Sequence, residues 1–185
     1  MKLHNLNTKK DFKTRNLCLC IGNFDGIHIG HQHVINKIIH SSKLDNLKSA
    51  IMTFVPHPKI YFKRTSNNFN IITNDYKKKF LNSLGVENYI EYKFNNTLSN
   101  LEAIKFIEKI LVKQLHVKKI IVGKDFRFGK DRKGDTALLK KLSKKYQYKL
   151  SIISHVKNKK TNLKFSSSII RQNINNGSFE NVSQS

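Results

Sequence analysis

The sequence predicts an α/β fold in which a parallel sheet is flanked by helices. Short apolar, β-prone runs alternate along the chain with longer segments whose apolar residues recur at the 3.6-residue period of a helix. Turns that contain glycine or proline directly follow three of the expected strands, at residues 22–31, 55–58 and 123–134. Because parallel strands end at the same edge of a sheet, these turns should open on one edge, where α/β proteins bind ligands.

The first half of the chain is expected to hold three strands and two helices after a polar lead-in. Pro56 and Pro58 permit neither a central strand nor a helix to continue past them. Thr73 or Asn74 can cap the second helix, which Gly85 ends. The expected segments, in order, are a lead-in with room for a short strand (1–15), a strand (17–21), a helix (30–42), a strand (49–54), a basic, aromatic loop over a site (59–72), a helix (73–84) and a strand (86–92).

The second half continues the alternation of strands and helices. Asp135 or Thr136 can cap one helix there, and Gly177 ends the last one. The helix expected to start at Asn100 has an apolar stripe made of Leu101, Ile104, Ile107, Ile110 and Leu111. The expected segments are a helix (100–115), a strand (118–122), a glycine-rich basic turn (123–134), a helix (135–146), a strand (148–153), a polar turn (157–161), an extended piece (162–165) and a helix (166–177).

The composition fits one globular domain with a strongly basic surface. The chain has 185 residues, and its 35 Lys and Arg against 12 Asp and Glu give a net charge of +23. Either a composition rich in Lys, Asn and Ile, as in AT-rich genomes, or selection for a polyanionic partner would explain this charge. Because the lysines are spread along the chain, the first explanation is favoured, and no nucleic-acid partner is expected.

The cysteines and the length of the apolar runs indicate the cellular compartment and whether the chain spans a membrane. Cys18 and Cys20 lie two apart in an expected strand, so they point to the same face, and no further Cys could complete a zinc site. We interpret them as small buried hydrophobes, whose free thiols fit a reducing cytoplasm. The apolar runs are far shorter than the ~20 residues of a membrane span, and residues 1–15 lack the apolar core of a secretory signal. We therefore expect a cytoplasmic protein without a membrane partner.

Residues 20–31 have the order of a strand, a tight polar turn and a helix start. In this geometry free backbone N–H groups and the positive end of a helix face an anion, which predicts phosphate binding. Gly22, Gly26 and Gly30 permit backbone conformations and approaches that a Cβ would block. His28 and His31, three residues apart, can share a face and donate hydrogen bonds to the charge that develops on an attacked phosphoryl group.

Further polar stretches suit an anionic ligand at the same edge. Asp25 either braces the turn by accepting backbone N–H groups or helps to place a metal ion. One serine suffices for a helix cap, so the run at 166–168 with Arg171 one turn later indicates an anion site. The turns at 123–134 and 56–58 are either parts of the site or solvated connections.

Four stretches resemble, in the same order, the N-terminal adenylyltransferase module of the prokaryotic FAD synthetase family. They are residues 22–32 (GNFDGIHIGHQ), 53–58 (TFVPHP), 123–129 (GKDFRFG) and 166–171 (SSSIIR). The HIGH sequence at 28–31 looks like the HxGH motif of the nucleotidyltransferase superfamily, and the serine run looks like its second motif. The resemblance extends over residues 17–177 and implies a Rossmann-like parallel sheet of the nucleotidyltransferase type.

The resemblance implies the reaction ATP + FMN → FAD + pyrophosphate, with Mg²⁺ as cofactor. A phosphate oxygen of FMN would attack the α-phosphorus of ATP, so catalysis would consist of positioning and charge stabilisation without a protein nucleophile. By the family pattern, the catalytic residues are His28, His31, Ser167, Ser168 and Arg171. ATP binding is assigned to these five residues together with Gly22, Phe24, Asp25 and Gly26. Flavin binding is assigned to Pro56, His57, Pro58, Asp125, Phe126, Arg127 and Phe128, whereas the metal ligands and the oligomeric state are left unassigned.

The sequence departs from the family pattern in two ways. Ser168 stands where the family usually has threonine, and since the hydroxyl is kept, little effect is expected. The family normally continues into a β-barrel riboflavin kinase module, for which the eight residues after Gly177 leave no room. The chain is therefore expected to be a single adenylyltransferase domain over 1–185, either a natural stand-alone enzyme or a piece of a bifunctional protein, without kinase activity of its own.

Three other functions compete with FMN adenylyltransferase. A related enzyme could transfer AMP or CMP to a different phosphate, although the stretches at 56–58 and 125–129 argue against it. A basic nucleic-acid-binding protein would show a basic stripe with aromatic platforms, and the sequence has none. A degenerate module that binds flavin without turnover is disfavoured, because every motif residue needed for catalysis is present.

Overall fold

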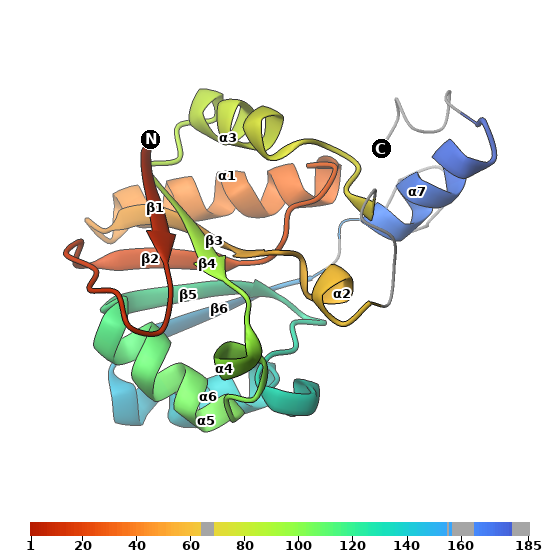
Figure 1. The fold of residues 1–185 in the computed structure, drawn as a ribbon. Helices are drawn as coiled ribbons and strands as arrows, with labels where there is room; N and C mark the ends of the chain where they lie inside the picture. The colour runs from red at the N-terminus through yellow and green to blue at the C-terminus, as the bar shows by residue number, and fades with distance from the viewer. Residues whose placement is uncertain (64–68, 155, 157–164, 179–185) are drawn as a thin grey trace.

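A six-stranded sheet, parallel throughout, forms the centre of the molecule (Figure 1). The computed structural model describes residues 1–63, 69–154, 156 and 165–178. The strands are β1 (Lys2–Leu6), β2 (Leu17–Ile21), β3 (Lys48–Val55), β4 (Asn88–Lys93), β5 (Val117–Gly123) and β6 (Lys149–Ile153), in the spatial order β1-β4-β3-β2-β5-β6. The predicted α/β class and the five strands expected beyond the lead-in are confirmed, and the lead-in contributes β1 as an edge strand.

The helices alternate with these strands. They are α1 (Ile29–Leu44), α2 (Pro58–Tyr61), α3 (Asn74–Ser83), α4 (Asn96–Ser99), α5 (Ala103–Lys105), the π-helix η2 (Phe106–Gln114), the 3-10 helix η3 (Lys130–Arg132), α6 (Thr136–Tyr146) and α7 (Ser167–Asn175). The expected caps are present: the side chains of Thr73, Asp135 and Ser166 accept backbone N–H groups at the starts of α3, α6 and α7. Polar caps of this kind satisfy N–H groups that a helix start leaves without partners.

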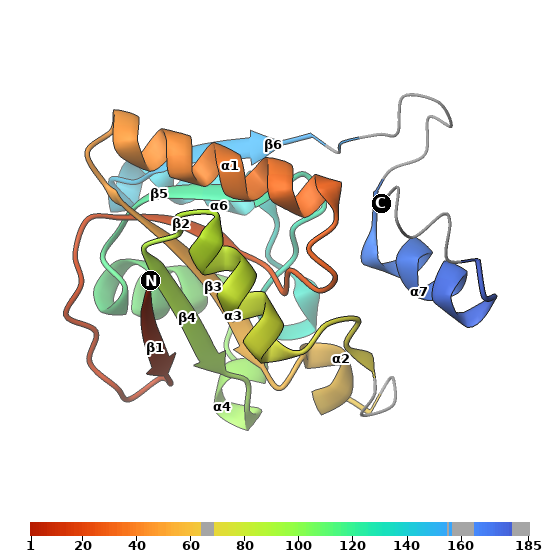
Figure 2. The same cartoon turned by 90° about the horizontal axis from the view of Figure 1, so that it is seen from above.

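Two hydrophobic cores lie on opposite faces of the sheet. The alternation of β2 divides its side chains between them, with Leu17, Leu19 and Ile21 in one core and Cys18 and Cys20 in the other. Helices α1 and α3 cover the face of the cysteines, whereas η2 and α6 cover the other face (Figures 1 and 2). Both cysteines are buried and unpaired, as the sequence predicts. In the described part of the chain, no helix is long and apolar enough to cross a bilayer.

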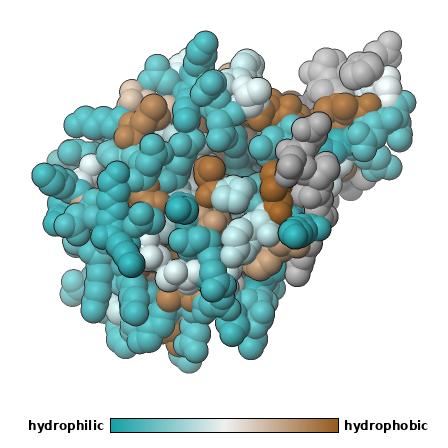
Figure 3. Space-filling view, in the orientation of Figure 1, coloured by the Kyte–Doolittle hydropathy of each residue, from teal (hydrophilic) through white to brown (hydrophobic). Residues whose placement is uncertain are grey.

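The chain order creates a switch point next to β2. The chain moves from β2 to β3 and β4 on one side, then crosses to β5 and β6 on the other. Ligands of open α/β sheets bind at the carboxyl ends of the strands beside such a point. Helix α7 lies beyond this edge and stands apart from the helices that cover the sheet (Figures 1 and 2). The molecular face in Figure 3 is mostly hydrophilic, and apolar residues are visible on the side toward α7.

The helix predicted from Asn100 is wrong at its start. Asn100 instead closes α4, and the next helix begins at Ala103 with Glu102 as its N-cap. The carbonyl of Leu101 accepts the N–H of Lys130 at 2.8 Å, which keeps this carbonyl out of a helical ladder. Of the predicted apolar stripe, Ile107, Ile110 and Leu111 are buried and Leu101 packs against the core, whereas Ile104, in the short α5, is 45% exposed.

The segment after Pro58 also differs from the expected loop. Pro58 occupies the first turn of α2, where its missing N–H is tolerated, so the segment begins with a helical turn. The rest of the predicted loop reaches residues 64–68, which lie outside the described residues. The predicted polar turn at 157–161 and all but the last residue of the extended piece at 162–165 lie outside them as well.

Candidate active site

The turn between β2 and α1 is compact and has unusual backbone conformations. Phe24, Gly26 and Ile27 all have positive φ angles, of 48°, 82° and 37°. A Cβ on Gly26 would meet the Ile71 side chain at 3.1 Å, so a larger residue there would be both strained and crowded. The backbone reverses within these few residues, which brings the start of α1 back to the carboxyl end of β2.

The two histidines of the turn are stacked on each other. Their ring centroids are 3.7 Å apart with an interplanar angle of 17°. His28 is the N-cap of α1, and its Nδ1 accepts the backbone N–H of His31 at 3.2 Å. The neutral ring of His28 therefore carries its proton on Nε2, as a donor. A Cβ on Gly30 would lie 3.1 Å from Nδ1 of His28, which explains the glycine between the histidines.

Burial keeps both histidines neutral. Desolvation lowers the pKa of His28 to about 4, although the nearby Asp25 acts in the opposite direction. Desolvation also lowers the pKa of His31 well below its usual value, and His28 and Lys77 add to this effect. Nδ1 of His31 is buried and has no hydrogen-bond partner in the described part of the chain. Such an atom is expected where a bound ligand or water completes the site.

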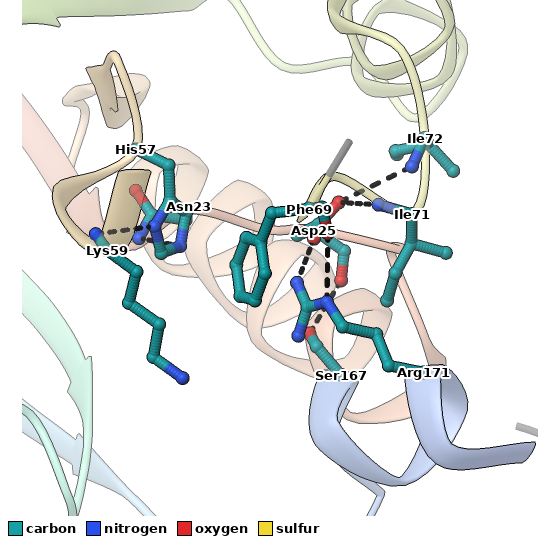
Figure 4. Close-up of polar contacts among 9 residues, drawn as sticks. All are labelled: Asn23, Asp25, His57, Lys59, Phe69, Ile71, Ile72, Ser167 and Arg171. Carbon is teal, nitrogen blue, oxygen red and sulfur yellow. Dashed lines mark hydrogen bonds and ion pairs between the residues drawn. The ribbon is translucent and has the colours of Figure 1, made fainter. Parts of the chain in front are cut away.

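Asp25 connects the turn to two distant segments (Figure 4). Its carboxylate accepts the backbone N–H groups of Ile71 at 2.9 Å and Ile72 at 3.4 Å, and it pairs with the guanidinium of Arg171. Of the two roles expected for Asp25, bracing of the backbone is therefore the one that the geometry displays. The side chain of Asp25 is almost fully buried, so these donors compensate for its loss of hydration.

The serine run and Arg171 hold α7 against the turn. Ser166 caps the helix, and the hydroxyl of Ser167 donates to the backbone carbonyl of Asp25 at 2.7 Å. Ser168 is exposed and lines the cavity described below. Arg171 also donates its Nε–H to the carbonyl of Phe69 at 3.0 Å and lies 3.6 Å above the ring of Phe69 (Figure 4). The guanidinium thus connects α7 to Asp25 of the turn and to Phe69.

A cavity of about 430 Å³, which we call the glycine-turn cavity, opens at the switch point. The expectation that the two glycine-rich turns and the serine run meet is confirmed, since all three line this cavity. Its walls come from the ends of β2, β5 and β6 and from α7, and include Gly22, Asn23, Phe24, Asp25, His28, His31, His57, Lys59, Phe69, Asp125, Phe126, Ser154, Ser166, Ser167, Ser168 and Arg171.

His57 joins the segment after β3 to the glycine turn. Its Nδ1 accepts the backbone N–H of Lys59 at 3.0 Å, and its Nε2 lies 2.9 Å from the amide nitrogen of Asn23. Burial lowers the pKa of His57 to about 4, so the ring is neutral and carries its proton on Nε2. A proton on Nε2 requires an acceptor, so we assign the Asn23 amide the rotated orientation, with Oδ1 facing the ring. This rotation also gives a partner to Oδ1, which is otherwise buried without one among the described residues.

A second cavity, which we call the aromatic cavity, has a volume of about 750 Å³. Phe94 lines it, and the ring centroids of Phe54, Tyr61 and Phe62 lie between 5.2 and 5.8 Å from that of Phe94. Sequence reasoning missed Phe54 and Phe94 as site residues, although both end or follow strands at the edge where the site was expected. The other lining residues include Pro58, Lys59, Leu98, Phe106, Arg127, Phe128, Gly129, Lys130 and Arg132.

The residues expected on the flavin side are divided between the cavities. His57, Asp125 and Phe126 line the glycine-turn cavity, whereas Pro58, Arg127 and Phe128 line the aromatic cavity. Pro56 lines neither, and it follows Val55 through a cis peptide bond. Gly26 lies behind the wall, against Ile71, and so shapes the turn without lining a cavity.

The described residues do not form a metal-binding site from protein side chains alone. No group of three or more His, Cys, Asp or Glu side chains among them could hold a metal ion. The carboxylate of Asp25 is already engaged by two N–H groups and by Arg171. Asp125 is the other carboxylate that lines the glycine-turn cavity.

A parallel α/β sheet with a histidine-containing turn and a helix start at its switch point defines the class of α/β proteins that bind phosphate-bearing ligands at this edge. Comparison with known proteins identifies its family. The model of the FAD synthetase family matches residues 10–169, and the chain belongs to that family. The resemblance stated from the four motifs is thereby confirmed.

Similar proteins support the same assignment. The chain is 36% identical over 159 residues to the bifunctional riboflavin kinase/FMN adenylyltransferase of Buchnera aphidicola subsp. Schizaphis graminum, covering 85% of this chain and 50% of that protein. It is 30% identical over 185 residues to the FAD synthetase of Listeria monocytogenes, covering 100% of this chain and 74% of that protein. The chain thus spans about half the length of several curated relatives that it matches.

A solved structure shares the fold. It is a crystal structure named as a macrolide-efflux protein from Streptococcus pneumoniae, with a TM-score of 0.79 and 27% identity. The similarity covers 93% of this chain and 55% of that chain.

Proposed function

We propose that residues 1–185 catalyse the transfer of AMP from ATP to FMN, which yields FAD and pyrophosphate. The observation that carries this proposal is the pairing of two adjacent cavities. One has a helix start and two neutral histidines, which suit phosphates, and the other has aromatic walls, which suit an isoalloxazine ring. Relatives named as FMN adenylyltransferases and an FAD synthetase support the same reaction.

In this proposal the glycine-turn cavity binds the ATP phosphates. His28 and His31 donate N–H groups to the phosphate oxygens, together with the backbone N–H groups at the start of α1. Ser167 and Ser168 supply hydroxyls from α7, and Arg171 faces the same cavity. A neutral imidazole has one N–H group, which it can donate to a phosphate oxygen. The preorganised donors would stabilise charge on the pentavalent phosphorus.

The aromatic cavity takes the flavin in this proposal. Phe54, Tyr61, Phe94 and Phe128 offer ring faces and edges to the isoalloxazine, and Pro58 and Arg127 lie at the same wall. Asp125 and Phe126 line the glycine-turn cavity, so we place them on the nucleotide side, although the family pattern suggested the flavin side. His57 lies next to the boundary between the two cavities, and we propose that its contacts hold Asn23 and Lys59 in place.

We propose that Mg²⁺ arrives bound to the ATP phosphates. Mg²⁺ keeps several waters and commonly binds through one or two carboxylates and substrate phosphates, which agrees with Asp25 and Asp125 as the cavity's carboxylates among the described residues. When bound, the ion would neutralise phosphate charge. The proposal also places the enzyme in the cytoplasm, where the free thiols of Cys18 and Cys20 would remain reduced.

A transferase with another phosphate-bearing acceptor is the second candidate. The aromatic cavity distinguishes the two, since a small or purely polar acceptor would not need the rings around Phe94. We infer that the acceptor is aromatic and bulky, as FMN is. Nucleic acid is not part of the proposed function.

A chromatographic assay tests the proposal. The 185-residue chain is incubated with ATP, Mg²⁺ and either FMN or riboflavin, and the flavins are separated. We expect FAD from FMN and no conversion of riboflavin. Absence of FAD from FMN would contradict the proposed reaction, and FMN formed from riboflavin would contradict the expectation that these residues lack kinase activity.

A further inference from the structure

One side chain belongs to both cavities. Among the described residues, Lys59 alone lines the glycine-turn cavity and the aromatic cavity. Its neighbour His57 lines only the first, and its neighbour Pro58 lines only the second. Residues 57–59 therefore run along the boundary between the two cavities, and the lysine side chain lies at their junction.

The charge of Lys59 is not neutralised by an acid. Within the described part of the chain, no carboxylate lies within ion-pair distance of its ammonium group. The ammonium instead lies 5.4 Å from the ring centroid of Phe69 (Figure 4). Arg171 contacts the same ring but is paired with Asp25. An aromatic ring attracts a cation without cancelling its charge, so Lys59 keeps a full positive charge at the junction.

The stem of Lys59 is fixed at its base. Its backbone N–H donates to Nδ1 of His57 at 3.0 Å, and it follows Pro58, whose φ angle is restricted. His57 in turn contacts Asn23 of the glycine turn. The side chain is exposed, so it can leave the ring of Phe69 and reach a ligand while its Cα stays in place.

We propose that Lys59 binds the phosphoryl groups at the junction of the two cavities, namely the phosphate of the flavin acceptor and the α-phosphate of the nucleotide. This inference rests on the proposed function. An oxygen of the acceptor phosphate forms a bond to the α-phosphorus while the bond from that phosphorus to the bridging oxygen breaks, and the electron pair leaves with pyrophosphate. Two anionic phosphates must approach each other, and an ammonium with three N–H donors between them offsets their repulsion.

Binding of two flavins that differ by one phosphate tests this proposal. Lys59→Gln in the 185-residue chain should weaken FMN binding about tenfold or more, because a charge-assisted contact is lost, and should leave riboflavin binding unchanged. Titrations that follow flavin fluorescence give both dissociation constants. Lys59→Arg, which keeps the charge, should retain most of the preference for FMN. Lys63→Gln removes an exposed charge nearby that lines neither cavity and should change neither constant.

The outcomes separate this proposal from the proposed function. Equal weakening of FMN and riboflavin by Lys59→Gln would show that Lys59 only packs in the aromatic cavity, and unchanged FMN binding would show that it does not contact the phosphate. Either result would overturn the proposal while leaving FAD formation by the unaltered chain intact. Failure of the unaltered chain to bind either flavin would contradict the proposed function itself, and the role of Lys59 with it.

Discussion

Asp25 and Arg171 are 146 positions apart in the sequence and form an ion pair that docks α7 on the glycine turn. The carboxylate is almost fully buried, and it also accepts two backbone N–H groups from the segment that follows Phe69. Since α7 carries the serines of the glycine-turn cavity, this pair completes one wall of the candidate site.

Asp25→Asn should therefore loosen α7 as well as lower stability. The amide still accepts backbone N–H groups but leaves Arg171 without its counter-charge, so we expect the free energy of unfolding to fall by about 1–3 kcal/mol. Hydrogen exchange should accelerate in α7 more than in the sheet.

A surface pair provides the control for this change. Asp131→Asn disrupts an exposed contact of 3.8 Å with Lys133, and it should alter the free energy of unfolding by only about 0–1 kcal/mol. Equal effects of the two substitutions would show that the Asp25–Arg171 pair has no special role in docking α7.

Two substitutions of His28 should separate its structural role from its proposed role in catalysis. His28→Ala removes the helix cap of α1 and should cost about 1 kcal/mol of stability. His28→Asn restores a capping oxygen but lacks the Nε2–H donor, so stability should return while FAD formation stays slower by about 10²–10³-fold. Denaturant unfolding measures the stability, and initial rates measure FAD formation. A stable His28→Asn variant that forms FAD at the normal rate would show that His28 does not contact the phosphates.

The buried histidines predict that acid destabilises the protein. Burial lowers the pKa of His28 and of His57 to about 4, below the usual 6.5, so the unfolded chain binds more protons than the folded chain between these values. Stability should be complete above about pH 6.5 and should decrease as the pH falls toward 4. Unfolding measured at several pH values tests this, and His28→Asn combined with His57→Gln should flatten the dependence. An unchanged slope in the double variant would assign the acid sensitivity to other groups.

Phe94→Leu should weaken the binding of both riboflavin and FMN. The ring of Phe94 contacts three other rings of the aromatic cavity. Its loss should weaken riboflavin and FMN binding about equally, by around tenfold. The reason is that ring stacking contributes about 0.5–1.5 kcal/mol in addition to the burial of apolar surface. Tyr76→Leu is the control, since Tyr76 is 55% exposed on α3 and lines neither cavity. Flavin titrations compare the two. A Phe94→Leu variant that binds like the control would place the flavin elsewhere.

Local patterns in the sequence predicted much of the fold and the glycine-turn cavity. Strand alternation, helix caps such as Asp135 and the spacing of His28, Gly30 and His31 depend on residues close together in the chain, so they are visible without a structure. The start at Asn100 was wrong because a local stripe does not reveal a carbonyl taken by a distant N–H.

Contacts between distant segments could not be derived in this way. The aromatic cavity combines Phe54 near the end of β3, Phe94 directly after β4 and the loop at 127–132, which only the sheet order brings together. The partner of Arg171 was unpredictable for the same reason, since any of several carboxylates or a phosphate would satisfy a guanidinium.

In the proposed reaction the α-phosphorus of ATP becomes attached to the phosphate of FMN. The most direct measurement incubates the chain with FMN, Mg²⁺ and ATP that carries ³²P in either the α or the γ position, followed by separation of the flavins. We predict that one α-phosphorus from ATP enters each FAD formed and that the γ-label is found in pyrophosphate. Label from the γ position on a flavin, or α-label that remains in AMP and ATP while no FAD forms, would contradict the proposed transfer of AMP to FMN.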